Sequence, residues 1–409
     1  MRDTVISSAV WSSDPDVPGS MSGPRQAQQP TSVPIDTWGD WLTADVQDLG
    51  RLPLAELYSR FWPTQGELIF TGGCEFECQH CIYPPDYGRF NAGLPPEAWE
   101  RVFRDLVAGL GMTTFVCGGR AVTRDGVEAL ARLRAVAPDG RIGMIDNGIS
   151  FVPHRERLAE LRLDWIDVSL DGDEAAHDRQ RGRPGSFRAG LAGAQWLMTE
   201  RIAPRVNILT CLTVLNAGTV TSMMSRLNAE GFKNFFVTPV SVAEPRPLRH
   251  LVVEAAGFAA FVESLARATE SLNDAHLEVE IHDVRYLRFL LEFAPGLLRN
   301  GLAERDHIRW VVVNGATPLY VNYYPLSLSG TRELIVNTNA DVVAPKAMAW
   351  GRVPRNAVVG NLMAEPAAAL IRRLPESPAF TFFEAELERE REALEAVRHQ
   401  LAAAIGRST

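Results

Sequence analysis

Three of the five cysteines in this chain lie close together, and they constrain its chemistry more than any other feature. They are Cys74, Cys78 and Cys81, spaced as C-x3-C-x2-C. Thiolates are soft ligands that suit iron–sulfur clusters or zinc. Three of them can hold three irons of a [4Fe–4S] cube, and the fourth iron is then open, as a reactive metal site requires. The spacing therefore predicts a reactive iron–sulfur site.

Zinc and disulfide interpretations compete with the cluster. A Cys3His zinc site would recruit His80, but structural zinc sites usually space their ligands as two separated pairs. A disulfide needs an oxidising compartment and a small scaffold, and the sequence shows neither a secretion signal nor a cysteine-rich composition. Free thiolates instead predict a reducing, cytoplasmic location.

Composition narrows the class of protein. A hydrophobic content of 46% and a charged content of 22% are typical of a soluble globular enzyme. No apolar run approaches the ~18 residues that a membrane-spanning helix needs, so we expect no membrane partner. The formal net charge is −9, which repels polyanions and predicts no nucleic-acid partner. The oligomeric state is not indicated.

The pattern along the chain divides it into three regions. Residues 1–50 are rich in Ser, Pro and Gln without a sustained period, which predicts a disordered tail. Residues 51–250 alternate short β-rich runs with helical stretches, the pattern of parallel βα units. Residues 251–409 break this rhythm and predict a smaller α+β extension, closed by a charged helix over about 384–405.

Six predicted strands are too few for a closed eight-stranded barrel. The sequence therefore predicts an α/β fold with a partial (β/α)6 TIM-type barrel, whose reactive face lies at the carboxyl ends of the strands. Ser186 is the predicted N-cap of the fourth helix. The predicted strands cover 67–71, 113–117, 141–145, 165–170, 206–215 and 234–240, and the predicted helices cover 95–109, 125–136, 154–161, 186–199 and 219–231.

Together with the cysteines, a glycine pair after the second predicted strand resembles the radical S-adenosylmethionine (radical SAM) superfamily. Gly118 and Gly119 correspond to a Gly-Gly-Glu-Pro motif, whose glycines let the backbone approach the SAM amino group. Arg120 stands in place of the family's glutamate. A guanidinium cannot accept a hydrogen bond from an ammonium, so this chain must make one SAM contact differently.

A second string resembles the SPASM-domain subgroup of radical SAM enzymes, which includes anaerobic sulfatase-maturating and peptide-modifying enzymes. It reads Ser-Leu-Asp-Gly over 169–172, His-Asp-x-x-Arg over 177–181 and Gly-Ser-Phe over 185–187. The resemblance implies that Ser169 binds SAM and that Arg181 grips its carboxylate with two hydrogen bonds. Asp171 is either a cofactor contact or, like His177, a residue that orients the loop. His80 is a further candidate cofactor-binding residue.

The remaining candidates follow other strands. Asn147 and Gly148 match the subgroup's Thr-Asn-Gly, which implies that Asn147 binds the cofactor. Asp146 is a candidate base or substrate ligand, although Asp-Asn-Gly is also a common turn. Cys117 is a candidate hydrogen-atom donor, against the alternative of a small core residue. Asp283 ends a strand candidate and is the third candidate catalytic residue.

The C-terminal region resembles a degenerate form of the subgroup's cluster-binding extension. The Asn-Ala-Asp turn at 339–341 and the Val-Gly-Asn trio at 359–361 match its pattern. Ala344 and Lys346 stand near the place of an expected ligand, and no cysteine follows Cys211. The resemblance therefore implies a lid or substrate platform without auxiliary clusters.

The resemblance implies a radical SAM enzyme with one [4Fe–4S] cluster and an external electron donor, flavodoxin or ferredoxin. Its 5′-deoxyadenosyl radical would take a hydrogen atom from the substrate. The missing auxiliary cysteines and the lack of a recognisable N-terminal peptide-binding module favour a small polar metabolite, such as a sugar, aminocyclitol or nucleoside. Modification of a ribosomal peptide is the alternative, and an iron–sulfur or zinc binding or sensor protein is the non-enzyme alternative. Epimerisation, dehydrogenation, deoxygenation and decarboxylation all stay open as outcomes.

Overall fold

One curved sheet organises the protein. Among the residues that the computed structural model describes, it contains 14 strands in the order β1-β9-β10-β11-β8-β7-β6-β5-β4-β3-β2-β12-β13-β14. The structure describes residues 33–35, 65–70, 74, 76–81, 93–240, 247–298, 301–303, 307–324, 333–343, 358–373, 388, 390 and 392. No helix within these ranges has the length and apolar character needed to cross a bilayer.

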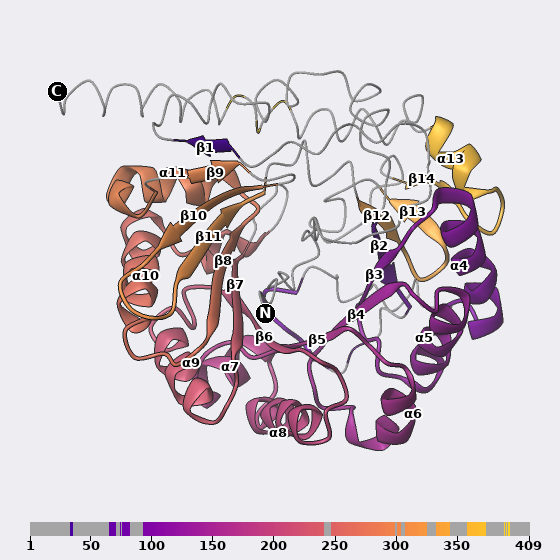
Figure 1. The fold of residues 1–409 in the computed structure, drawn as a ribbon, viewed down its shortest axis with the longest axis horizontal. Helices are drawn as coiled ribbons and strands as arrows, with labels where there is room; N and C mark the ends of the chain where they lie inside the picture. The colour runs from indigo at the N-terminus through magenta and orange to yellow at the C-terminus, as the bar shows by residue number, and fades with distance from the viewer. Residues whose placement is uncertain are drawn as a thin grey trace.

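The centre of the sheet is a run of parallel strands in sequential order, with helices around the outside of the arc (Figure 1). The strands are β2 (Gln65–Ile69), β3 (Thr114–Gly118), β4 (Arg141–Asp146), β5 (Trp165–Ser169), β6 (Val206–Leu212), β7 (Asn234–Pro239) and β8 (His276–Ile281). The helices are α4 (Pro96–Leu110), α5 (Arg124–Val136), α6 (Arg155–Glu160), α7 (Glu174–Arg181), α8 (Ser186–Thr199), α9 (Val220–Ala229), α10 (Ala255–Ala268) and α11 (Val284–Phe293). The strands and helices predicted before residue 250 match this run within a few residues.

Two short sets of strands extend the arc at its ends. β11 (Leu319–Tyr323) pairs in parallel with β8, and β12 (Glu333–Val336) pairs in parallel with β2. The outer strands are β10 (Ile308–Val312), β9 (Gly301–Ala303), β1 (Val33–Ile35), β13 (Asp341–Val343) and β14 (Val358–Asn361). The strand order ends at β1 and β14 without closing, so the prediction of an open, partial α/β barrel is confirmed for the described part of the chain. The sheet itself runs across the boundary that we predicted at residue 250.

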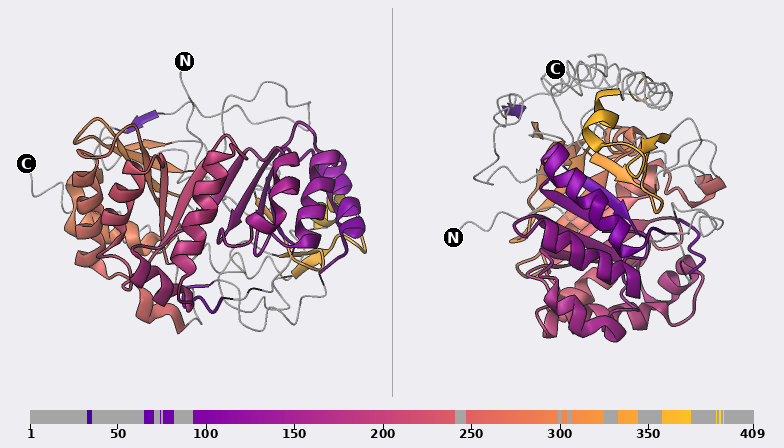
Figure 2. Two further views of the ribbon diagram at one scale, coloured as in Figure 1. Left: turned by 90° about the horizontal axis from the view of Figure 1, so that it is seen from below. Right: turned by 90° about the vertical axis from the view of Figure 1, so that its right-hand side faces the viewer.

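The C-terminal elements pack on the β12 end of the arc. α13 (Ala367–Arg373) lies against α4, as two further views show (Figure 2). The Asp105 carboxylate of α4 accepts a hydrogen bond of 2.6 Å from the Ala367 N–H. This contact ties the last described helix to the first helix of the barrel.

The two faces of the sheet differ sharply in polarity. Successive residues of a strand point to opposite faces. In β8, Leu277 and Val279 lie in the apolar core beneath the helices, so Glu278 and Glu280 lie on the inner face of the arc, where both are fully buried. The interior of this barrel is therefore polar and acidic along β8.

Four further predictions concern the start of α8 or residues that lie largely outside the described ranges. Ser186 is the first residue of α8 rather than its N-cap, because Gly185 takes the capping position with a φ of +80°. The predicted tail of residues 1–50 lies outside the described residues, apart from β1. The predicted terminal helix over 384–405 is described only at residues 388, 390 and 392, which are helical. Ala344 and Lys346 also lie outside the described residues.

Candidate cofactor site

The cysteine loop is attached to the end of α7. The last carbonyl groups of a helix have no partner within it. Here the backbone N–H of Gln79 donates to the carbonyl of Gln180 at 2.9 Å, and its side-chain amide donates to the carbonyl of Arg179 at 2.9 Å. Within the loop, the Cys81 N–H donates to the Cys78 carbonyl at 3.1 Å. One residue of the cysteine motif thus caps α7 and fixes the loop against the barrel.

Glycine at position 182 makes this close approach possible. Gly182 ends α7 with a φ of +66°, a conformation that side chains disfavour. A Cβ at this position would lie 2.8 Å from the carbonyl oxygen of Glu77, in the cysteine loop. The C-terminus of α7 and the loop therefore meet at backbone distance.

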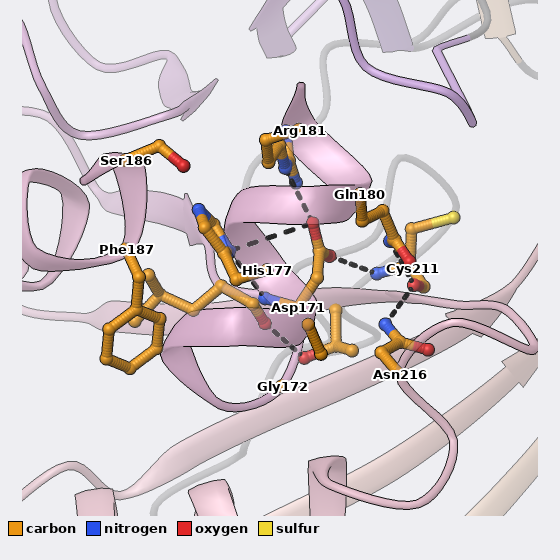
Figure 3. A network of polar contacts seen from close by, with 12 residues as sticks. Asp171, Gly172, His177, Gln180, Arg181, Ser186, Phe187, Cys211 and Asn216 are labelled. Carbon is orange, nitrogen blue, oxygen red and sulfur yellow. Dashed lines mark hydrogen bonds and ion pairs between the residues drawn. The ribbon is translucent and has the colours of Figure 1, made fainter. Parts of the chain in front are cut away.

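Arg181, the last residue of α7, lies between the Asp171 carboxylate and the Cys78 sulfur. Figure 3 shows its contact with Asp171. Its Nε donates to Oδ2 of Asp171 at 2.6 Å, and its Nη1 lies 4.0 Å from Sγ of Cys78. The Asp171 side chain is fully buried, and that of Arg181 is 11% exposed. A buried ion pair of this kind holds the guanidinium in one orientation, since charge-assisted hydrogen bonds are short and directional.

Asp171 is itself fixed from two other directions (Figure 3). Its Oδ1 accepts the backbone N–H of Cys211 in β6 at 2.9 Å, and its own N–H donates to Nδ1 of His177 at 3.0 Å. Burial opposes ionisation, but the Arg181 charge outweighs it and holds the pKa of Asp171 at about 2. Asp171 is therefore a charged anchor, and His177 orients it as the structural interpretation predicts.

Electrostatics around the loop favour neutral imidazoles and protonated thiols. Burial lowers the pKa of His80 to about 4, with Arg181 adding to the effect, and its Nδ1 has no partner among the described residues. Burial raises the pKa of Cys78 to about 11, although Arg181 opposes the shift. A thiol of this kind loses its proton at neutral pH when a metal ion binds to its sulfur.

The donor set fits an iron–sulfur cluster better than one zinc ion. Cys74, Cys78 and Cys81 form no disulfide, and the charges of Cys74 and Cys81 act on Cys78. Within the described ranges, no three His, Cys, Asp or Glu side chains converge on a single ion. In a cluster each cysteine binds its own iron, so no such convergence is needed.

Asp146 joins the loops that follow β3 and β4. Its carboxylate accepts the N–H of Gly148 at 3.0 Å and that of Val122 at 3.4 Å, and the residue is 3% exposed. Nearby, Nη2 of Arg120 donates to the Ser150 hydroxyl at 2.9 Å, a second link between the same loops. These contacts support the turn interpretation of Asp146 and give Arg120 a positioning role.

The glycine pair and the polar residues after β4 and β5 lie at the same ends of the strands. Gly118 ends β3, and Gly119 has a φ of +74°, which a side chain disfavours. The Asn147 side chain accepts the N–H of Ile149 at 3.1 Å. Ser169 ends β5, two residues before Asp171, and is 8% exposed.

Cys117 and Asp283, two of the predicted catalytic residues, make contacts of a structural kind. Cys117 is fully buried in the apolar core beneath the helices, paired in register with Leu68 and Met144. Burial raises the pKa of its thiol, and its side chain is on the opposite face from the barrel interior. Asp283 is the N-cap of α11 and accepts the Arg285 N–H at 2.9 Å. The surroundings of Cys117 thus match the alternative of a small core residue, and the carboxylate of Asp283 caps a helix.

Sequence reasoning missed α7 and the residues that join it to the cysteine loop. The helix has little apolar periodicity, because its segment reads Glu-Ala-Ala-His-Asp-Arg-Gln-Arg. Two signals mark its ends: Asp173, whose side chain caps the Ala176 N–H at 2.8 Å, and Gly182. Nothing in the sequence predicts that Gln79 caps this helix, since the contact joins distant segments.

Comparisons with known proteins agree with this geometry. Residues 68–227 match the sequence profile of the Radical SAM superfamily. The chain is 27% identical over 176 residues to pre-heme d1 synthase of Dinoroseobacter shibae, covering 41% of each protein. It is 30% identical over 173 residues to the AdoMet-dependent heme synthase of Methanosarcina barkeri, covering 41% of this chain and 49% of the relative. The chain thus spans less than half the length of these curated relatives.

Solved structures share the fold at low sequence identity. anSMEcpe with bound AdoMet and the Cp18Cys peptide has a TM-score of 0.54 and 16% identity, covering 78% of this chain and 82% of that one. SuiB of Streptococcus suis bound to S-adenosylmethionine has a TM-score of 0.52 and 12% identity, covering 88% and 71%. These similarities show a shared fold. Residues 68–227 therefore carry the sequence profile of a radical SAM domain, and enzymes of that superfamily use a [4Fe–4S] cluster and S-adenosylmethionine.

Proposed function

We propose that the protein is a cytoplasmic radical SAM enzyme that cleaves SAM reductively and abstracts a hydrogen atom from a small polar metabolite. One observation carries the cofactor part of this proposal. The C-x3-C-x2-C loop is held by backbone and side-chain hydrogen bonds at the end of α7, where Arg181 faces the sulfur of Cys78. Flavodoxin or ferredoxin would supply the electron.

The chain's own residues divide the work of holding the cofactors. Cys74, Cys78 and Cys81 hold the cluster, and the Gly118–Gly119 backbone, Asn147 and Ser169 contact SAM, with His80 adjacent inside the loop. When bound, the cluster and SAM together supply one-electron reduction and hydrogen-atom abstraction. The protein orients both cofactors, and a buried site keeps water away from the reacting atoms.

Only part of the Arg181 guanidinium is available to bind a SAM carboxylate. Asp171 already occupies its Nε, which excludes the side-on fork that uses Nε and a terminal nitrogen. Within the described residues the hydrogen bonds of Arg181 involve Nε and Nη1, so Nη2 is the donor available to a carboxylate. The proposed SAM contact of Arg181 therefore uses the terminal end of the guanidinium.

The polar inner face of the barrel supports a polar substrate. Asn207 donates to Asp167 at 2.8 Å, Asn322 donates to Glu278 at 2.6 Å, and Thr238 donates to Glu280 at 3.1 Å. Buried carboxylates and amides need hydrogen-bond partners, and hydroxyl or amino groups of a substrate would be compatible with them. A sugar, aminocyclitol or nucleoside carries such groups.

A ribosomal peptide is the second candidate substrate. The fold matches that of anSMEcpe with a bound peptide and that of SuiB, which has also been crystallised with the precursor peptide SuiA. Both candidate functions include cleavage of SAM, so only the identity of the substrate distinguishes them.

The cofactor part is tested by anaerobic reconstitution. The protein is loaded with iron and sulfide, reduced with dithionite and given SAM, and 5′-deoxyadenosine is measured beside a Cys78→Ala control. Product and about four irons per chain in the native protein alone are expected. Tight zinc without iron, or iron without any SAM-dependent change of the EPR signal, would contradict the proposal and favour the binding or sensor alternative.

The substrate part is tested with the same assay. Panels of sugars, aminocyclitols and nucleosides are compared with panels of short peptides for stimulation of 5′-deoxyadenosine formation. Transfer of deuterium from a labelled compound into 5′-deoxyadenosine identifies the substrate. Deuterium transfer from peptides alone would replace the metabolite proposal with the peptide alternative.

A further inference from the structure

We propose that Arg181 raises the reduction potential of the iron–sulfur cluster, and that Asp171 is the positioning residue that holds the Arg181 guanidinium against the Cys78 sulfur. This inference rests on the proposed cluster at Cys74, Cys78 and Cys81. It assigns Arg181 a role toward the cluster, separate from its proposed contact with SAM.

The geometry gives the guanidinium a fixed direction. Nε is bound to Asp171 at 2.6 Å, so the planar group turns its Nη1 toward Cys78 Sγ at 4.0 Å. Two hydrogen bonds hold Asp171 in place. The Cys211 N–H donates to its Oδ1 at 2.9 Å, and its own N–H donates to Nδ1 of His177. Three segments, α7, β6 and the loop after β5, therefore determine where the positive charge lies.

Arg181 is the cation that acts on this sulfur. Its Nη1 lies 4.0 Å from Cys78 Sγ, whereas the Asp171 carboxylate is bound at Nε. Burial strengthens charge interactions of this kind, because the effective dielectric constant in a protein interior is far below that of water.

The sign of the effect follows from charge. Reduction adds one electron from the external donor to the cluster and its thiolates, making them more negative by one unit. A fixed guanidinium beside a thiolate stabilises this more negative state, and net charge and hydrogen bonds to sulfur are established determinants of cluster potentials. Removal of the Arg181 charge should therefore lower the potential and make the cluster harder to reduce.

The first test is an EPR-monitored redox titration of the reconstituted protein without SAM. Arg181→Gln should shift the one-electron equilibrium about tenfold toward the oxidised cluster, or about 59 mV lower in midpoint potential. Arg181→Lys keeps the charge and should shift it less. The matched control is Arg157→Gln, which removes the same charge from an exposed pair with Glu128 and Glu160. Equal potentials for Arg181→Gln and the control would overturn the proposal.

The second test is made on the native protein, and the variant Arg181→Lys serves only to assign the signal. Protein labelled with 15N in the guanidino groups of arginine is reduced and measured by ENDOR. A 15N coupling from Arg181 is expected in the native protein, and Arg181→Lys should remove it. A native protein that holds the cluster and cleaves SAM, yet shows no 15N coupling, would overturn this inference and leave the proposed function standing.

Discussion

Gln79 and Gln180 are joined by a backbone hydrogen bond of 2.9 Å that links the cysteine loop to the last turn of α7. The bond ties together two motifs that are distant in sequence, the C-x3-C-x2-C run and His-Asp-x-x-Arg. Its consequence is that cluster loading and the packing of α7 are coupled. Changes at the end of α7 should therefore reach the metal site without touching a ligand.

Gly182→Ala should destabilise the cysteine loop. A methyl group there would clash with the Glu77 carbonyl, since the Cβ position is 2.8 Å from that oxygen. We expect backbone strain of about 1 kcal/mol and roughly 1–3 kcal/mol more from the clash. Iron content after reconstitution and the urea midpoint measure both effects.

Gly185→Ala is the matched control for that change. Gly185 has a similarly positive φ of +80°, but no atom of the described residues, apart from its chain neighbours, lies within 4 Å of its Cβ position. It should show the strain cost alone and load iron normally. Equal iron loss in both variants would show that the contact with Glu77 is not what holds the loop.

Asp178→Ala should destabilise the junction between α7 and α8 by about 2 kcal/mol, because charged acceptors contribute strongly. The carboxylate accepts hydrogen bonds from the Gly185 N–H at 2.5 Å, the Ser186 hydroxyl at 2.8 Å and the Phe187 N–H at 2.8 Å. Urea unfolding measures the loss, with the exposed Asp139→Ala as control. Equal midpoints for the two variants would argue against a junction held by Asp178.

The stability of the fold should fall as the pH drops from about 6.5 to about 4. Burial lowers the pKa of His177 to about 4, although Asp171 opposes the shift. In this window the unfolded chain binds a proton that the folded state excludes, so unfolding becomes easier at lower pH. His80 acts in the same direction.

His177→Gln should flatten this pH dependence. The variant removes one of the two imidazoles whose pKa burial lowers, so fewer protons are taken up on unfolding. Urea unfolding of cluster-free native and variant protein at several pH values between 4.5 and 7 measures the slope. Parallel curves for the two proteins would mean that His177 is not titrating with the fold.

Asp146→Asn separates a structural role from a catalytic one. The amide keeps an oxygen that can accept the Gly148 N–H, so we expect a small loss of stability and retained SAM cleavage. Asp146→Ala removes both acceptor contacts and should cost about 1–3 kcal/mol. If Asp146→Asn abolished SAM cleavage at unchanged stability, the carboxylate charge itself would be required.

Local patterns predicted the barrel because each βα unit repeats the same signals. β3, β4 and β7 begin or end within one residue of their predicted bounds, since buried parallel strands are short apolar runs between helices. α7 was missed because its packing depends on caps and on one buried polar face rather than on apolar periodicity. The position of Cys117 in the core could not be predicted, because proximity to a strand end does not determine the face to which a side chain points.

The sequence by itself determined the open α/β barrel and the match of residues 68–227 to the Radical SAM superfamily, because these depend on spacing and periodicity within short segments. It also predicted the three cysteine ligands from their spacing. Only the tertiary structure decided how Asp171, Arg181 and Cys78 are arranged. That arrangement depends on contacts between β6, α7 and the cysteine loop, which are far apart in the chain and meet only when the sheet curves. The orientation of one guanidinium is therefore a property of the whole fold.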